Sequence, residues 1–222
     1  MSTLPSTFVT SLAAMNTSLA VMSTSVSGGG GIGYLKLTKQ CIWEFGVDGQ
    51  EVQPGSLWAV DHASFQHGFV CWEGDENKPN QKHGEEMRAV TEIPINLADL
   101  PAMPAGCKWT VQMGLKVLCL NGEDKGTALS FASNSLGARN AITALLREVV
   151  ARAAAGEVDL LVPVISLGYD TYISKKWGKI VVPIFTVASW ASVSGSPDDV
   201  DVTPPADTPP AAGVRKRRMK VV

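Results

Sequence analysis

The feature that most constrains the fold is a succession of short β-type segments, each ended by turn residues. Glycine, proline, asparagine or aspartate separate many of the segments. Strands are expected at residues 34–37, 41–45, 56–60, 68–72, 86–90, 109–120, 127–131, 161–167 and 179–190. One helical pattern interrupts them. Asn134 or Ser135 is its candidate N-cap, and its apolar stripe stops near Gly156.

Many short strands with a single helix favour a mainly β fold of the α+β type, and we expect a small OB-like barrel. Residues 73–84 are polar and are expected to form a loop, while residues 94–106, with three prolines, are expected to form an irregular connection. Gly114 lies within the longest expected strand, where a bulge or bend is expected.

The two ends of the chain differ in composition from the middle. Residues 1–27 carry no charged side chain, and their apolar residues recur at three- and four-residue spacing. This spacing suits either a short helix that packs on the body or on a neighbouring subunit, or a flexible arm. After residue 193, serine, proline, aspartate and alanine dominate and cannot build a core. We therefore expect a flexible or partly helical arm (1–31), one β-rich OB-like domain (32–193) and a disordered Pro-rich tail with a basic end (194–222).

The charge balance excludes a protein whose whole surface is basic. The net charge is −2; residues 195–222 hold five of the 19 basic and four of the 21 acidic side chains, so 14 basic and 17 acidic ones remain elsewhere. Any site for nucleic acid must therefore be a local patch. The four cysteines form no CxxC pair and no basic segment precedes an apolar run, which predicts a cytoplasmic protein with reduced thiols. No apolar run reaches the ~20 residues of a membrane span, so no membrane partner is expected.

Motifs for catalysis and for cofactors are missing from the sequence. It contains no GxSxG, P-loop or HExxH pattern, so we expect no enzyme and no cofactor. Gly28, Gly30 and Gly33 spell GxGxxG, but no strand precedes them and no helix follows. His62 and His67, near Cys71, match no zinc spacing, so no metal site is expected. An enzyme with a dispersed site around these two histidines is the remaining catalytic alternative.

A local patch of the required kind lies in residues 169–190, where lysines interleave with aromatic residues. Ammonium groups follow the phosphates of a single strand while aromatic rings stack on its unpaired bases. Lys36 and Lys39 lie beside Tyr34 on an expected strand and extend the patch, and the basic cluster of the tail adds phosphate contacts. The candidate nucleic-acid-binding residues are Lys36, Lys39, Tyr172, Lys175, Lys176, Trp177, Lys179, Arg215, Lys216, Arg217 and Arg218.

The alternative to a binding patch is an exposed hairpin with solvated lysines and half-buried aromatic rings. Whether Trp177 faces a base or the core is left open by the sequence. For the basic cluster, the alternative is a solubilising tail without a partner.

Residues 34–72 and 172–190, followed by a Pro-rich tail with a basic end, resemble a family of small bacteriophage early proteins. The resemblance implies a role beside phage replication or recombination genes, with location in the host cytoplasm. Its closest functional class is that of single-stranded DNA-binding proteins with an OB fold. Many of those proteins end in an acidic tail that recruits replication partners, whereas this chain ends in RKRRMKVV. This departure indicates that the tail itself contacts phosphates.

The resulting hypothesis is a non-catalytic single-stranded DNA-binding protein that acts in phage DNA replication or recombination. Its expected partner is single-stranded DNA; a second copy of the chain and replication or recombination proteins are further candidates. The alternative hypothesis is a phage structural or protein-interaction module that assembles through its N-terminal arm. The sequence leaves open the preference between DNA and RNA and the oligomeric state.

Overall fold

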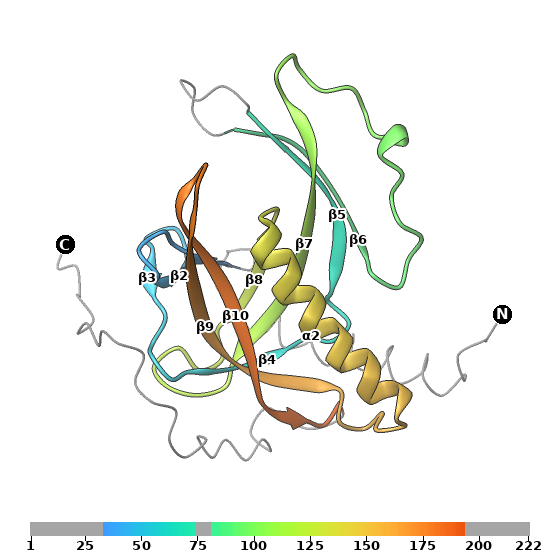
Figure 1. Ribbon diagram of the computed structural model, residues 1–222. Helices are drawn as coiled ribbons and strands as arrows, with labels where there is room; N and C mark the ends of the chain where they lie inside the picture. The colour runs from blue at the N-terminus through green and yellow to red at the C-terminus, as the bar shows by residue number, and fades with distance from the viewer. Residues whose placement is uncertain (1–32, 74–80, 194–222) are drawn as a thin grey trace.

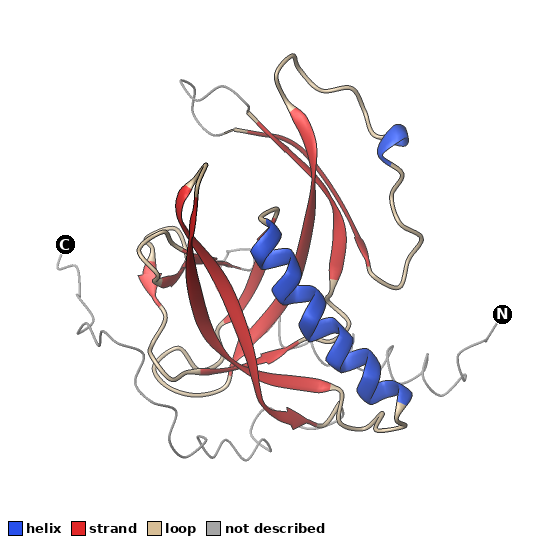
Figure 2. Cartoon of the chain, viewed as in Figure 1, coloured by secondary structure: helices blue, strands red, loops and turns tan. Residues whose placement is uncertain are grey.

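The computed structural model describes residues 33–73 and 81–193. The expected N-terminal arm and the tail, with candidates Arg215, Lys216, Arg217 and Arg218, lie outside these residues. The described body contains ten β-strands, one α-helix and one short 3₁₀ helix (Figures 1 and 2). The prediction of a mainly β fold with one helix is confirmed.

The elements follow one another in the order of the expected segments. Their bounds are β1 Gly33–Leu37, β2 Trp43–Phe45, β3 Gln50–Glu51, β4 Leu57–Val60, β5 Gln66–Trp72, β6 Lys82–Ala89, η1 Leu97–Asp99, β7 Lys108–Cys119, β8 Ala128–Ser133, α2 Leu136–Ala154, β9 Val162–Ser174 and β10 Gly178–Ala191.

The strands form one mixed sheet in the order β10-β9-β4-β7-β8-β1-β2-β3, in which only β1 and β8 pair in parallel. Strand β7 is shared between two partners on one edge. Its C-terminal part pairs with β4 and its N-terminal part pairs with β5, which in turn pairs with β6. Residues 61–65 leave the sheet between β4 and β5, yet Ser64 Oγ accepts a 2.8 Å hydrogen bond from the Lys116 N–H of β7. The β5–β6–β7 arm therefore extends from the body along β7 (Figure 1).

The core lies between the strands of the body and one face of α2. Trp58 and Ile165 of the sheet and Ile142 of the helix are fully buried. Trp43 and Phe185 lie on segments far apart in the chain, and their ring centroids are 6.0 Å apart. The Trp43 indole N–H donates a 3.1 Å hydrogen bond to the carbonyl oxygen of Gly168. These contacts join β2 to the β9–β10 hairpin across the molecule.

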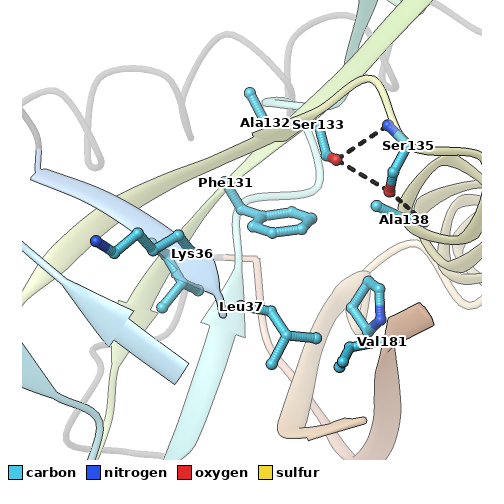
Figure 3. A pocket seen from close by; sticks show the side chains of 10 residues that line it. Lys36, Leu37, Phe131, Ala132, Ser133, Ser135, Ala138 and Val181 are labelled. Atoms are coloured by element: carbon cyan, nitrogen blue, oxygen red, sulfur yellow. Dashed lines mark hydrogen bonds between the residues drawn. The ribbon is translucent and has the colours of Figure 1, made fainter. Parts of the chain in front are cut away.

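The predicted OB-like barrel is wrong in one respect: the sheet is not closed. Strand β10 lies at one end of the strand order and β3 at the other, and within the described residues β10 pairs only with β9. Pro183 lies in the middle of β10 and has no N–H to donate, which confines such a strand to an edge. A pocket of about 140 Å³ separates β1 from β10 at this point (Figure 3).

Helix α2 packs against β10 and β7. Ser135, one of the two expected caps, accepts a 3.3 Å hydrogen bond from the Ala138 N–H. A side chain at Gly137 would overlap Val182 of β10, so this glycine allows the start of the helix to approach the strand closely. In the described part of the chain, no helix combines the length and the apolar character that crossing a bilayer requires.

Candidate nucleic-acid interface

The outer half of the β9–β10 hairpin projects beyond the sheet. β9 and β10 pair along their whole length, from Val162↔Ala191 to Ser174↔Gly178. β4 covers β9 only at residues 164–166. Among the described residues, the part of the hairpin from Gly168 to the turn is therefore a two-stranded ribbon (Figure 1). We call this part the outer ribbon.

The turn of the outer ribbon holds three of the predicted site residues, at positions 175–177. Ser174 Oγ accepts hydrogen bonds of 3.3 Å from the backbone N–H groups of Lys176 and Trp177, and Gly178 follows with φ +69°. A side chain in such a turn has no core to enter, and Trp177 is 70% exposed. Lys176 Nζ lies 4.6 Å from the centroid of the Trp177 ring. The structure thus places an exposed ring beside an ammonium group, and Trp177 does not face the core.

The strand register assigns the other residues of the outer ribbon to its two faces. Directly paired residues point to the same face of a sheet. Lys179 is paired with Ile173, and four residues further along β10 Pro183 is paired with Tyr169 of β9, so both pairs point to the same face. Tyr172 is paired with Ile180 and therefore points to the other face. The structure therefore places Tyr172 and Lys179 on opposite faces of the outer ribbon. Tyr169, which is 39% exposed, lies on the same face as Lys179, which we call the lysine face.

Lys179 also reaches the turn between β1 and β2, which carries Lys39. Its Nζ donates to Cys41 Sγ at 3.4 Å, across 138 residues of sequence. The Cys41 N–H donates to the Thr38 carbonyl oxygen at 3.0 Å and closes the turn, in which Lys39 is exposed. The turn that carries Lys39 therefore lies next to Lys179 of the hairpin, although no spacing in the sequence indicates this.

Lys36, another candidate phosphate ligand, lies beside a carboxylate. It is exposed on β1, but its Nζ lies 3.2 Å from Glu44 Oε2, so a carboxylate already neutralises its charge. Its stem lines the pocket between β1 and β10, and Figure 3 shows its ammonium group pointing away from that pocket. The hydroxyls of Ser133 and Ser135 in the same pocket bond to each other at 3.2 Å. Most of the residues that line this pocket are apolar, and its polar side chains are those of Lys36, Ser133 and Ser135.

The two histidines considered for a metal do not come together with Cys71. His67 and Cys71 lie four residues apart on β5, which corresponds to about 13 Å along a strand. Within residues 33–73 and 81–193, the one group of three potential ligands close enough to share an ion is Glu73, His83 and Cys107. This group lies at the end of the β5–β6–β7 arm, where no motif spacing in the sequence indicates a metal.

His62 has a different consequence, for stability. Its ring is buried in the excursion between β4 and β5, and its Nδ1 has no hydrogen-bond partner among the described residues. Burial lowers the pKa of His62 below 6.5, although the neighbouring Asp61 carboxylate opposes this shift. The unfolded chain therefore binds a proton more readily than the folded chain as pH falls below 6.5.

We accordingly expect the wild-type chain to lose stability between pH 6.5 and pH 5, by up to about 1.4 kcal/mol per pH unit. Urea denaturation at pH 7.5, 6.5 and 5.5 measures this loss. His62→Gln, which does not titrate, should show a smaller loss. Burial raises the pKa of Asp61, and this shift stabilises the folded chain as pH falls, in the opposite direction to that of His62. Comparing the wild-type chain with His62→Gln at each pH therefore isolates the contribution of the His62 imidazole. Parallel pH profiles for the two proteins would contradict the assignment.

No family model matches this chain, and no match was found among curated proteins or solved structures. The resemblance to phage early proteins stays a prediction, and the function rests on the residues described above.

Proposed function

We propose that the chain is a non-catalytic single-stranded DNA-binding protein and that it acts in phage DNA replication or recombination. The observation that carries this proposal is Trp177, which is 70% exposed at the tip of the outer ribbon with an ammonium group 4.6 Å from its ring. Exposed aromatic rings beside cations are typical of surfaces that bind single-stranded nucleic acid. The adjacent cations favour a polyanion with accessible bases as the partner.

The proposed surface runs from the tip of the outer ribbon along its lysine face to the β1–β2 turn. Lys175, Lys176, Lys179 and Lys39 contact phosphates. Trp177 and Tyr169 stack on bases, and Tyr172 lies on the opposite face of the outer ribbon. Outside the tail the chain carries 14 basic and 17 acidic residues, a net charge of −3 that already includes the four lysines of this surface, so the remainder of the body disfavours DNA. The basic residues Arg215, Lys216, Arg217 and Arg218 of the tail add phosphate contacts.

A titration of the full chain with oligo-dT, followed by tryptophan emission over a salt series, tests the proposal. Stacking on Trp177 should change the emission, and oligo-dT should bind more tightly than a duplex of equal length. Each neutralised phosphate contributes about −0.7 to the slope of log K against log salt for a single strand. The four lysines of the surface therefore predict a slope of about −3, which the basic tail makes steeper.

Two variants serve as the comparison in this titration. Joint replacement of Lys175 and Lys176 by Ala should flatten the slope by about 1.4, since two phosphate contacts are lost. Arg147→Ala removes an exposed positive charge from α2 and should leave the slope unchanged. Unchanged emission at low salt, with no retention of oligo-dT in a gel, would refute DNA binding and favour the protein-interaction alternative.

A further inference from the structure

We propose that the β5–β6–β7 arm holds a structural Zn²⁺ site formed by Cys71, Glu73, His83 and Cys107. This inference does not depend on the proposed DNA binding. His83 Nε2 lies 3.2 Å from Glu73 Oε2, and Cys107 Sγ lies 4.0 Å from Glu73 Oε1. The three ligand atoms of Glu73, His83 and Cys107 lie within 4.8 Å of one another. These three side chains lie on β6 and at the adjoining ends of β5 and β7.

Cys71 belongs to the cluster through its contact with the second thiol. Its side chain is fully buried. The Cys71 side chain forms a hydrogen bond with that of Cys107 and lies near the Glu73 carboxylate. Two adjacent thiols and a carboxylate can all act as ligands of one divalent ion, which binds with release of the thiol protons.

Strand pairing explains why β5 and β7 bring three of the ligands together. Cys71 and Glu73 are two residues apart along β5 and its extension, so they point to the same face. Trp72 pairs with Lys108, which places Cys107, one residue earlier, across from Glu73. The sequence separation of 34 residues between Glu73 and Cys107 gives no hint of this contact.

A β-bulge brings the fourth ligand into position. Cys71 pairs with Gly84 whereas Trp72 pairs with Lys82, so His83 is the extra residue on β6. A bulge changes the direction of the side chain it carries. Here the imidazole reaches the Glu73 carboxylate on the cysteine face instead of alternating to the opposite face.

The cluster is shielded from water on the side of β7. The side chains of His83 and Glu73 are only 19% and 13% exposed. The Trp109 ring covers Gly84, where an added Cβ would lie 2.6 Å from Trp109 Cη2. The Trp109 indole N–H is held by the Pro101 carbonyl oxygen at 2.9 Å. A polar group of this composition in a sheltered position is stabilised by a bound cation.

The ligand types select the ion. Two sulfurs, one imidazole and one carboxylate form the tetrahedral set that Zn²⁺ prefers, whereas Ca²⁺ and Mg²⁺ require oxygen ligands. Zinc bonds of about 2.0–2.3 Å imply ligand separations of roughly 3.3–3.8 Å. The ligand atoms of Glu73, His83 and Cys107 lie within 4.8 Å of one another, so they move closer together when the ion binds. Each thiol releases its proton to solvent when the ion binds. With four protein ligands the site is closed, and its role is to hold the ends of the three strands together.

The test uses the purified full chain. Mass spectrometry of metal content should find one Zn²⁺ per chain. Replacement of Zn²⁺ by Co²⁺ should give the intense visible and near-ultraviolet bands of a tetrahedral cobalt–thiolate centre. Cys107→Ser and His83→Ala should lose the stoichiometric metal. Cys41→Ser and His67→Ala remove the same residue types outside the cluster and should retain it.

Several outcomes would overturn the proposal. One is a wild-type chain with all four thiols reduced that takes up neither Zn²⁺ nor Co²⁺ at equimolar concentration. Another is a disulfide between Cys71 and Cys107 in protein purified without added oxidant, found by alkylation and peptide mapping. If circular dichroism shows that the Cys107→Ser variant does not fold, the stoichiometry and cobalt spectrum of the wild-type chain decide the question alone.

Discussion

Trp177→Ala is expected to weaken the binding of oligo-dT by about 5- to 150-fold, which corresponds to the ~1–3 kcal/mol contributed by one stacked base. The ring lies in a three-residue turn and is 70% exposed, so its removal leaves no cavity in the core. Tyr169→Ala should cause a second loss of the same order, and the two losses should approximately add if each ring holds its own base. Anisotropy of a labelled oligonucleotide measures both, without depending on tryptophan emission.

Tyr172→Ala is the matched control for Tyr169→Ala. The two tyrosines are three residues apart on the same strand and both are exposed, but the register places them on opposite faces of the outer ribbon. A DNA strand that binds on the face of Lys179 contacts Tyr169 but not Tyr172. Equal losses of affinity for the two tyrosine variants would show that DNA does not bind along the lysine face. Unchanged affinity of the Trp177→Ala variant would show that the tip is not part of the interface.

Gly68→Ala is expected to destabilise the fold severely, by about 3 kcal/mol or more, at the upper end of the cost of overpacking. Gly68 lies in β5, which is paired on one side with β6 and on the other with β7. A Cβ at this position would overlap the backbone carbonyl oxygen of Glu86 on β6. Because backbone atoms cannot rotate away as a side chain can, the two strands would have to separate. Urea denaturation followed by circular dichroism measures the loss.

The control is Gly168→Ala in β9. A Cβ at Gly168 would meet the side chain and backbone of Ile184 at 3.6 Å, which is ordinary van der Waals contact. This variant should change the free energy of unfolding by well under 1 kcal/mol, or stabilise the fold slightly, because alanine restricts the unfolded chain. A similar stability for the two variants would mean that β5 and β6 are less closely packed than the structure indicates.

The order of the elements could be predicted from the sequence because turn residues separate many of the short apolar segments. Residues 56–60 form a short, largely apolar run and residues 109–120 a longer one, and the structure has β4 and β7 there. The helix was also predicted, with Ser135 as one of its two candidate caps, because its apolar stripe and its stop near Gly156 are local signals.

The outer ribbon was missed in part because it buries almost nothing. β9 was expected to end at residue 167, but it continues to Ser174. Residues 169–173 are exposed on both faces, so no hydrophobic alternation reports that they form a strand. Their structure depends on pairing with β10, which a local pattern does not reveal.

The open sheet and the cluster that we propose binds zinc were missed for a related reason. Closure of the sheet depends on pairing between β1 and β10, which lie far apart in sequence. Pro183 is only a weak signal against such pairing. The segment at residues 73–84 was expected to be a polar loop, whereas β6 begins at Lys82 and carries His83 in a bulge. Cys107 joins that segment only because β7 pairs with β5. No motif spacing could have indicated these ligands, since the pairing of three strands defines the set.

The contact between Trp43 and Gly168 has a consequence for the order in which the chain folds. The hydrogen bond links residues 125 positions apart, and β4 takes its partner β9 from residues 164–166. During synthesis, one edge of β4 and the ring of Trp43 therefore stay uncovered until the last hairpin has emerged. Contacts of such large sequence separation form slowly. The sheet stays incomplete until the C-terminal hairpin completes the core. During this interval it is exposed to chaperones and to other nascent copies of the chain.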